Sequence, residues 1–403
     1  MLPLSRRIGL FGNFGTGNFG NEGSLESMLL FLRQARPDAE LTCICVNPEK
    51  VQRDYQIPAL PISWPGHRLL RKFTNWFHAV AAMRKFDVLL VPGTGILNDY
   101  CAPPFGLPYG LFRWCLAARL CGAKVLFMNV GAGPVHHPVS RWFIKSATRL
   151  AQYRSYRNNF SKEFVKSLGL DTSNDPVYPD IAFTLPLPVA PARTPAEVSR
   201  LTVGVGVMVY HGWFGHRRID NRIYEAHLIK VKEIVLWLLD SDRRVRLLMG
   251  DEMDQQAVED LQKVVAAERP SLPEGMLLAE RAHSCHDVMR QMADTDIVIS
   301  ARFHHLVFGL KLGKPVISIG YAEYHTNLMA EMGLAAFCQH SDQMKIELVR
   351  SQFEELVLKR SHYETVISNA LASCRRRLAQ QEHMLMSQFL EEAPSRIEEE
   401  VAN

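Results

Sequence analysis

Short apolar runs alternate with longer amphipathic segments over most of the chain. The runs that predict buried strands are Ile8–Phe11, Leu41–Val46, Val88–Val91 and Val125–Val130 in the first half, and Val203–Val209, Val245–Met249, Ile297–Ile299 and Val316–Ile319 in the second. The helices of the first half are expected to begin near Ser24, Leu69, Leu111 and Ser140. Strands separated by helices of this length are typical of βαβ units and parallel sheets.

A proline-rich segment separates the two halves. Residues 185–195 contain four prolines, which exclude the segment from the interior of either sheet. We therefore predict an α/β protein of two Rossmann-like, doubly wound domains that face each other across a cleft. The expected limits are residues 1–190 for the first domain, 200–375 for the second and 376–403 for a C-terminal helical tail. Because ligands of such sheets bind at the carboxyl ends of the strands, both domains should present those ends to the cleft.

The composition agrees with this organisation and excludes several classes of protein. A chain of 403 residues exceeds what one hydrophobic core usually supports. Its 47% hydrophobic and 22% charged residues are typical of globular domains rather than of disordered or fibrous chains. No apolar run approaches the roughly 20 residues that span a bilayer, and the amino-terminal residues lack a signal-peptide pattern, so we expect a cytoplasmic protein.

The charge and the cysteines argue against two kinds of partner. A net charge of +4, without an arginine-rich patch interleaved with exposed aromatic residues, does not predict nucleic-acid binding. The eight cysteines form no CxxC pair, and no histidine cluster has metal-ligand spacing. The sequence therefore predicts neither a bound metal nor another cofactor.

A cation and two imidazoles follow a predicted strand of the second half. In the segment Ser300-Ala-Arg-Phe-His-His305, a guanidinium and an imidazole come directly after an apolar run. A fixed cation beside a group that titrates near neutral pH suits an anionic substrate that must be protonated to react. Arg302, His304 and His305 are therefore candidate site residues. The alternative is structural, with Arg302 in an ion pair and the histidines capping a helix or packing in the core.

A glycine- and asparagine-rich loop follows the first predicted strand. Its candidate ligand-contacting residues are Gly17, Asn18, Gly20, Asn21 and Glu22. The glycines allow close backbone approach, and the amides at the start of the next helix can bind an anion or a hydroxyl. A GxGxxG match begins at Gly15, but the acidic residue that would hold a ribose after the second strand is missing, so dinucleotide binding is not predicted. The alternative is a tight turn without a ligand.

Two further glycine turns follow strands of the same predicted sheet. They are Pro92-Gly-Thr-Gly95 and Gly131-Ala-Gly-Pro134. Three glycine-bearing turns at the ends of successive strands indicate one face of the sheet specialised for a ligand, with Gly93 and Gly95 as candidate contacts. Any one of the turns alone is ordinary turn chemistry.

The order of these motifs resembles the polysaccharide pyruvyltransferase family over about residues 7–335. The elements that carry the resemblance are Asn18-Phe-Gly-Asn21, Gly93-Thr-Gly95, Gly133-Pro134, Arg157-Asn158, Pro179-Asp180 with Phe183, Arg302-Phe-His304 and Gly313–Tyr321. The chain departs from the family pattern at Asn21 and Asn158, where aspartate is usual, and at Thr94, where glycine is usual. Because Asn21 carries no charge, the neighbouring Glu22 is the candidate to replace the first aspartate.

The resemblance implies transfer of a pyruvyl group from phosphoenolpyruvate to a saccharide, with a cyclic ketal formed across two hydroxyls. The donor carries a phosphate and a carboxylate and so calls for fixed cations, of which Arg302 is the first candidate and Arg157 the second. Protonation of the enol carbon calls for a general acid, with His304 as the candidate and His305 as the alternative. This chemistry requires no metal, and phosphoenolpyruvate enters as a substrate rather than as a cofactor.

Aromatic residues add two predictions, each with an alternative. Tyr210 begins a loop whose rings either stack on a sugar or pack between the domains, and Tyr321 either lines the cleft or belongs to a simple turn. Residues 67–80 predict a basic helix with apolar residues at helical spacing. Such a helix either contacts an anionic membrane, where lipid-linked saccharides are assembled, or buries its apolar face as a crossover helix.

Together these observations predict a transferase with a glycosyltransferase B-like (GT-B-like) arrangement that acts on a precursor of an exopolysaccharide or a cell-surface glycan. Its partners would be phosphoenolpyruvate and a saccharide acceptor, and a lipid-linked acceptor would place it at the inner face of the plasma membrane. One alternative is a nucleotide-sugar-dependent GT-B glycosyltransferase, with Glu323 as the candidate to hold the ribose. Another is a non-catalytic, saccharide-binding relative, for which Asn21 and Asn158 argue.

Overall fold

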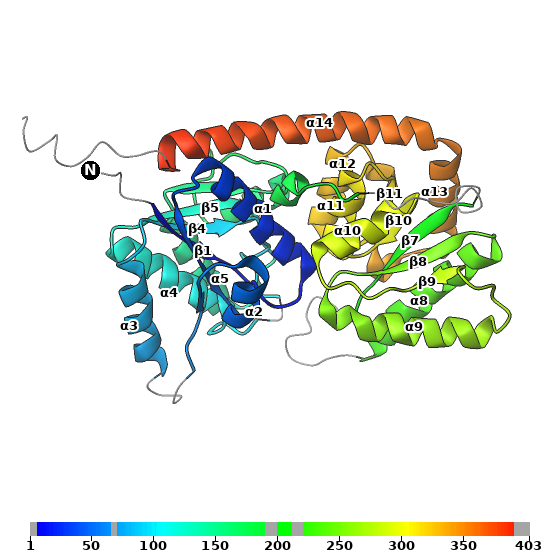
Figure 1. The fold of residues 1–403 in the computed structure, drawn as a ribbon, viewed down its shortest axis with the longest axis horizontal. Coiled ribbons are helices and arrows are strands. Elements are labelled where there is room, and N and C mark those ends of the chain that lie inside the picture. The colour runs from blue at the N-terminus through cyan, green and yellow to red at the C-terminus, as the bar shows by residue number, and fades with distance from the viewer. Residues whose placement is uncertain (1–5, 66–70, 101, 190–199, 212–220, 391–403) are drawn as a thin grey trace, which may run out of the picture.

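Two parallel sheets with helices on both faces form the protein, whose computed structural model describes residues 6–65, 71–100, 102–189, 200–211 and 221–390. Figure 1 shows the two sheets side by side, each within its own helical layers. Each sheet has six strands. The prediction of two Rossmann-like domains is therefore confirmed.

The first sheet has the strand order β3-β2-β1-β4-β5-β6. Its strands are β1 (Arg7–Phe11), β2 (Glu40–Cys45), β3 (Ala59–Pro61), β4 (Val88–Pro92), β5 (Lys124–Val130) and β6 (Tyr153–Tyr156). Its helices are α1 (Phe19–Ala35), α2 (Pro48–Tyr55), α3 (Arg71–Met83), α4 (Leu107–Leu120), α5 (Pro138–Arg149) and α6 (Asn159–Ser167), followed by the 3-10 helix η1 (Ile181–Thr184). Every residue of β4 is buried, as expected for a central parallel strand covered on both faces.

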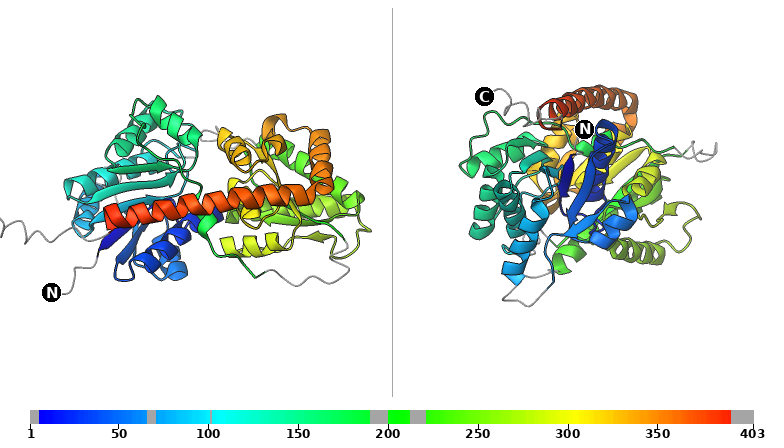
Figure 2. Two further views of the ribbon diagram at one scale, coloured as in Figure 1. Left: turned by 90° about the horizontal axis from the view of Figure 1, so that it is seen from above. Right: turned by 60° about the vertical axis from the view of Figure 1, so that its left-hand side comes forward.

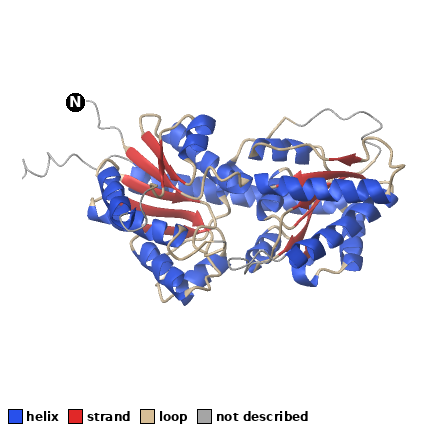
Figure 3. Ribbon diagram, turned by 90° about the horizontal axis from the view of Figure 1, so that it is seen from below, coloured by secondary structure: helices blue, strands red, loops and turns tan. Residues whose placement is uncertain are grey.

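The second sheet repeats this topology with the order β12-β11-β10-β7-β8-β9. Its strands are β7 (Thr202–Val207), β8 (Arg244–Met249), β9 (Leu277–Leu278), β10 (Ile297–Ser300), β11 (Val316–Gly320) and β12 (Cys338–His340). Its helices are α8 (Asn221–Asp240), α9 (Gln255–Glu268), α10 (Cys285–Ala293), α11 (Phe303–Lys311), α12 (Glu323–Glu331), α13 (Ile346–Leu358) and α14 (Arg360–Leu385). Figure 3 shows the strands of both sheets lying between helices.

The eight strands predicted from apolar runs are confirmed, within about two residues at each end. The four strands that the pattern missed, β3, β6, β9 and β12, are the two edges of each sheet. Helix α1 begins at Phe19 rather than near Ser24, because the side chain of Asn18 accepts a hydrogen bond from the backbone N–H of Asn21 and caps the helix early.

Helix α14 connects the two domains along one side of the molecule (Figure 2, left). It starts in the second domain and reaches the first, where Gln381 donates hydrogen bonds to Asn129 and, over 2.9 Å, to Ser155 Oγ. Arg377 donates to the carbonyl oxygen of Val177. The predicted tail from residue 376 therefore starts within the second half of α14. The domain limits 1–190 and 200–375 stay a prediction.

Helices α3, α4 and α5 pack against one face of the first sheet, around a core that includes Trp114 and Phe127. Helix α1 covers the opposite face and also contacts η1, α10 and α11, so it is the principal helix of the first domain at the domain contact. Residues 190–195 of the predicted linker, 212–216 of the aromatic loop and 67–70 of the basic helix lie outside the described residues. No helix among the described residues is both long and apolar enough to cross a membrane.

Candidate functional site

The carboxyl ends of both sheets open into one cavity of about 720 Å³ between the domains. The predicted site residues that line this cavity are Asn18, Asn21, Gly95, Arg157, Arg302, His304 and Tyr321. They come from the N-cap and first turn of α1, the turn after β4, the end of β6 and the segments after β10 and β11. Both domains therefore contribute polar groups to the same space, which we call the cleft cavity.

Arg302 is the cation that the second domain contributes. It precedes α11 directly and forms an ion pair with Asp254, whose side chain is fully buried. Asp254 also accepts hydrogen bonds from the backbone N–H groups of Val209 and Gly250, at 3.0 Å each. Burial lowers the pKa of Arg302, but the Asp254 carboxylate outweighs burial and raises that pKa overall. The guanidinium is therefore held in place from behind and stays charged.

Arg157 is the cation that the first domain contributes. It follows β6, and its Nη1 lies 3.5 Å from Asp180 Oδ2, in a pair that is almost completely buried. Its guanidinium carbon lies 4.3 Å from the centre of the Phe303 ring and 5.3 Å from that of Tyr324, so aromatic faces of the second domain contact a cation of the first. Neither Asp180 nor Asp254 is among the residues that line the cavity.

His304 lies in the first turn of α11, with Nε2 3.9 Å from Asp180 Oδ2. Burial lowers its pKa to about 4, and although Asp180 opposes this, Arg157 and Arg302 lower it further. The imidazole is therefore neutral near pH 7, which corrects the expectation of a group that titrates near neutral pH. His304 packs on the backbone of Gly20 so closely that a Cβ at Gly20 would lie 1.9 Å from His304 Nδ1.

The asparagines of the first loop form the opposite wall. Asn18 Nδ2 donates a hydrogen bond of 3.0 Å to Asp251 Oδ2 across the domain contact. Asn21 Nδ2 donates to the carbonyl oxygen of Asn13 at 3.3 Å, which holds the loop in shape. Among the described residues that line the cavity, Asp251 is the one carboxylate. This wall offers amide groups and one carboxylate to a polar ligand.

Two predicted residues face a different pocket. Glu22 and Gly17 line a second pocket, of about 660 Å³, on the other side of the first turn of α1. Glu22 accepts a 2.7 Å hydrogen bond from the backbone N–H of Gly15 and so shapes the loop, while burial raises its pKa to about 7. Because successive helical residues point in different directions, Glu22 does not take the place of an aspartate at Asn21 in the cavity.

Three other predicted residues lie beneath the cavity surface. His305 is 1% exposed, with Nδ1 3.0 Å from Ser300 Oγ, and burial lowers its pKa to about 3. Tyr210 is buried, with its ring centre 5.7 Å from that of Tyr321. Gly93 packs under Ile181, where a Cβ would lie 2.4 Å from the nearest side-chain atom. These residues support the lining of the cavity rather than forming it.

The sequence reasoning did not select the carboxylates behind the cations. Asp180 belongs to the Pro179-Asp180 motif, whose sequence alone indicates no role for the carboxylate. Asp251 and Asp254 follow β8 in the run Gly250-Asp-Glu-Met-Asp254. A polar run at the carboxyl end of a buried parallel strand is a signal that could have found both of them.

One group of side chains near the second pocket could hold a metal ion. The ligand atoms of Glu26, Cys285 and His286 lie within 4.8 Å of one another. His286 Nε2 and Glu26 Oε1 are 2.5 Å apart, so these two side chains pair with each other across the domain contact. The group lies outside the cleft cavity and contributes nothing to its lining.

The fold defines the class of protein. The chain is similar in structure to Alr3699/HepE of Anabaena, solved in complex with UDP, at 14% identity and a TM-score of 0.61, covering 96% of this chain and 99% of that one. A glycosyltransferase from Rickettsia africae gives 12% identity and a TM-score of 0.62, covering 97% and 100%. The UDP-GlcNAc 2-epimerase of Neisseria meningitidis gives 13% identity and a TM-score of 0.57, covering 93% of this chain and 100% of that one. The protein therefore has the GT-B-like fold.

The sequence defines the family within this class. The model of the polysaccharide pyruvyl transferase family matches residues 18–323, well over half of the chain. The protein belongs to this family, and the resemblance seen in its motifs is confirmed. No curated protein matches the chain in sequence.

Proposed function

We propose that the protein transfers a pyruvyl group from phosphoenolpyruvate to a saccharide and closes a cyclic ketal across two of its hydroxyls. The observation that supports this most is the pair of arginines at the cleft cavity. Arg157 and Arg302 are each held from behind by a buried aspartate, and both line the same space as His304. A donor with both a phosphate and a carboxylate needs two such fixed cations.

In this proposal, Arg302 and Arg157 bind the two anionic groups of the donor. A proton passes from His304 to the methylene carbon of phosphoenolpyruvate, so positive charge develops at the neighbouring carbon. A saccharide hydroxyl then attacks this carbon. Phosphate then leaves with its bonding electrons, and the second hydroxyl attacks the same carbon to close the ketal. Each hydroxyl releases one proton, of which one restores His304 and the other is taken up by the leaving phosphate.

His304 must gain a proton before it can act in this way. Burial lowers the pKa of its imidazole to about 4. Binding of a multiply charged anion beside His304 would offset the two arginines and raise this pKa, because an adjacent negative charge favours the imidazolium. The general acid would therefore form when the donor binds.

The acceptor would bind at the wall formed by the first loop. Asn18 and Asn21 offer amide groups to its hydroxyls, and Asp251 is placed to accept a proton or orient a hydroxyl. Glu22 has no part in this wall. We propose a precursor of an exopolysaccharide or cell-surface glycan as the acceptor and the cytoplasm as the place of reaction, at the inner face of the plasma membrane for a lipid-linked acceptor.

The test is to incubate the purified protein with phosphoenolpyruvate and a panel of free and lipid-linked oligosaccharides. We expect phosphate release that depends on the acceptor, and a product heavier by one pyruvyl ketal in the mass spectrum. His304→Gln, which keeps a polar side chain of similar reach, should lose more than about 99% of the rate while retaining the wild-type melting temperature. Full activity in this variant would refute the role of His304.

The same experiment separates the alternatives. Since several similar structures contain UDP or a UDP-sugar, UDP-glucose and UDP-GlcNAc form a second arm with the same acceptors. Consumption of a UDP-sugar without use of phosphoenolpyruvate would replace the proposal by a glycosyltransferase activity. Against this alternative, Glu323 is exposed and is not among the residues that line the cavity. Saccharide binding without any turnover would indicate a non-catalytic relative.

A further inference from the structure

One face of the first domain is unusually rich in cations. Residues 71–149, which contain α3, α4 and α5, include ten Lys or Arg residues, two aspartates and no glutamate. The whole chain, by contrast, has 46 basic and 42 acidic residues. The three helices pack side by side on the face of the sheet that turns away from α1, and Figure 2 (right) brings this side of the molecule forward. We call it the α3–α5 face.

The two aspartates do not neutralise this face. Asp87 pairs with the side chain of Arg7, outside this range, at 3.9 Å, and Asp99 is 4% exposed and accepts from the backbone N–H groups of His136 and His137. The basic residues on or beside the three helices that are exposed are Arg84, Lys85, Arg119, Arg141 and Arg149. Among the described residues of 71–149, the exposed charges are therefore mainly positive.

Large apolar side chains protrude from the same helices. The exposed ones are Phe73 (78%), Phe77 (73%), Phe105 (60%), Leu120 (70%) and Trp142 (56%). One interpretation of the sequence is that α3 buries its aromatic residues. Instead, Phe73 and Phe77 are exposed, and Ala79 and Met83 are the residues of α3 that pack in the core. Exposed aromatic residues interspersed with Lys and Arg are typical of a surface that inserts into a lipid headgroup region.

Two of these apolar residues are placed near the cleft cavity. In a βαβ unit the helix begins where the strand ends, so the first turns of α4 and α5 lie at the cleft edge of the sheet, whereas α3 lies farther from the second domain (Figure 1). Trp142 lies within the first two turns of α5, and Phe105 lies two residues before α4. Its neighbours Pro103 and Leu107 line the cavity itself. One wall of the cavity therefore continues onto the α3–α5 face.

We propose that the α3–α5 face binds an anionic lipid bilayer, with its aromatic side chains in the headgroup region and the mouth of the cleft cavity beside the membrane. The charge of the face matches that of anionic lipids. Docking would bring the acceptor wall to a saccharide carried on a lipid, a consequence that rests on the proposed function. Membrane binding itself does not depend on the activity.

Cosedimentation with vesicles tests the proposal. The full chain is mixed with vesicles of phosphatidylcholine alone, or with vesicles that also contain about 40% phosphatidylglycerol and so carry a negative surface charge. Each mixture is tested at about 0.1 M and at about 1 M salt. We expect binding to the anionic vesicles that weakens at least about tenfold in high salt, and little binding to the neutral ones. Equal binding to both, or binding to neither, would overturn the proposal; failure on both would favour a protein partner for this face.

Matched variants locate the surface. Phe73→Ser with Phe77→Ser should reduce vesicle affinity at least about tenfold, and Arg84→Gln with Lys85→Gln should reduce it and flatten its salt dependence. The control is Leu348→Ser with Leu358→Ser, two exposed leucines of α13 in the second domain, which should bind as wild type does. Because all six positions are exposed, the melting temperature should stay within a few degrees.

The variants also separate this proposal from the activity. None of the substituted residues lines the cleft cavity, so turnover of a water-soluble acceptor should be unchanged in each of them. Vesicle binding that persists in the Phe73→Ser, Phe77→Ser variant at the wild-type level would refute the assigned surface. A protein that binds vesicles but turns over no donor would leave this inference intact and refute the proposed function alone.

Discussion

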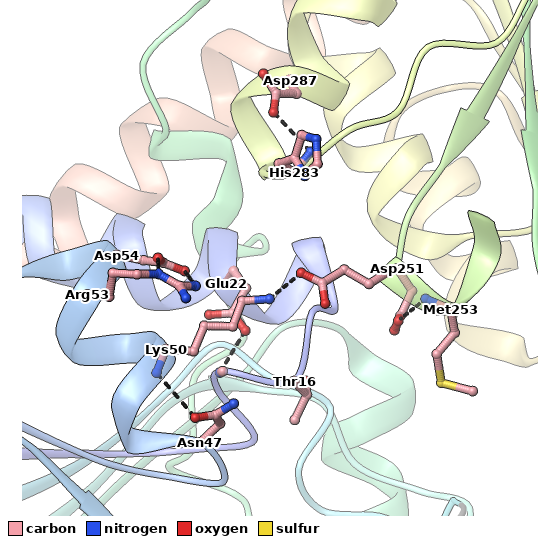
Figure 4. Close-up of polar contacts among 12 residues, drawn as sticks. Thr16, Glu22, Asn47, Lys50, Arg53, Asp54, Asp251, Met253, His283 and Asp287 are labelled. Carbon is pink, nitrogen blue, oxygen red and sulfur yellow. Dashed lines mark hydrogen bonds and ion pairs between the residues drawn. The ribbon is translucent and has the colours of Figure 1, made fainter.

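Two pockets flank the first turn of α1, and similar types of residue line both, but their charged groups are paired differently. The cleft cavity and the second pocket have comparable volumes, about 720 and 660 Å³, and both lie where the domains meet. Each contains arginine, histidine and carboxylate groups. Figure 4 shows the polar contacts of the second pocket, with Arg53 paired with Asp54 on α2 and His283 and Asp287 on the second domain.

The charges are arranged differently in the two pockets. In the second pocket, cations and carboxylates of the lining pair with one another: Lys50 with Glu252, Arg53 with Asp54, and His286 with Glu26. In the cleft cavity, the aspartates that hold Arg157 and Arg302 lie behind the lining, so the cations remain turned toward the space. Internal pairing suits a domain contact, whereas cations held from behind suit the binding of an anion.

The largest effect on catalysis should come from replacing each arginine of the cleft cavity by lysine, which keeps the positive charge but not the planar guanidinium. Arg302→Lys and Arg157→Lys should each lower kcat/KM for phosphoenolpyruvate by about 100-fold or more, since lysine loses the planar fork that grips two oxygens. Lysine keeps a positive charge beside Asp254 or Asp180, so the fold should survive. Steady-state kinetics and the melting temperature measure the two expectations.

The matched control is Arg53→Lys in the second pocket. Arg53 is paired with a neighbouring aspartate and is 70% exposed, so its replacement should change kcat/KM by less than about twofold. Equal losses at both pockets would erase the distinction between them. A normal rate in both cleft variants would mean that neither arginine grips the donor.

A smaller loss should follow from Gly20→Ala. A Cβ at this position would lie 1.9 Å from His304 Nδ1, so the imidazole must move. We expect kcat to fall by about 10- to 100-fold, because a displaced acid no longer reaches the reacting carbon. Gly23→Ala, one turn later in α1, meets its nearest neighbour at 3.3 Å and should change kcat less than threefold. If the two variants behave alike, the contact between Gly20 and His304 carries no function.

The pH dependence should report the environment of His304. A pKa of about 4 in the free protein predicts that kcat/KM, corrected for ionisation of the donor phosphate, falls up to tenfold per unit as pH rises above 5. The profile of kcat should stay flat to a higher pH, because the bound donor favours the imidazolium. The groups that face His304 are Asp180, Arg157 and Arg302. Identical profiles for kcat and kcat/KM would contradict a proton gained on donor binding.

The fold could be predicted from the sequence where burial is complete. Strands such as β4 and β10 lie in the middle of a sheet, so their apolar runs are continuous and their positions were clear. The edge strands escaped because they are short and half-covered, as in Tyr153–Tyr156, where only the last two residues are buried. Their pairing depends on a neighbour that is distant in sequence.

The candidate site could be predicted only in part, for a similar reason. Arg302, His304 and Asn18 follow directly from strand ends and glycine turns, and all three line the cavity. The pattern could not show that Glu22 turns away from the space that Asn21 faces, because that depends on the start of α1 at Phe19. It also could not show that burial makes His304 neutral, since this depends on how closely both domains pack around the ring.

The smallest effect on catalysis should come from Glu22 in the second pocket, whose main effect is on the pH dependence of stability. Burial raises its pKa to about 7 from an ordinary value of 4.5, while the Gly15 N–H, Lys50 and Tyr55 oppose this shift. A carboxyl whose pKa is raised in the folded protein stabilises it fully below the unfolded pKa, and this contribution is lost as pH rises through 7. Wild-type stability should therefore decrease between about pH 5 and pH 8, by up to about 3 kcal/mol from this group.

Glu22→Gln should remove this pH dependence, because the amide oxygen can still accept the hydrogen bond from Gly15 but carries no charge at any pH. The midpoint of thermal unfolding of the variant, relative to wild type, should therefore rise from pH 5 to pH 8. The control Glu49→Gln, at an exposed site on α2, should shift both midpoints equally. The rate of pyruvyl transfer should change by less than about threefold, because Glu22 shapes the loop without lining the cleft cavity. A loss as large as that expected at Arg302 would mean that Glu22 takes part in the reaction and that the second pocket belongs to the same site.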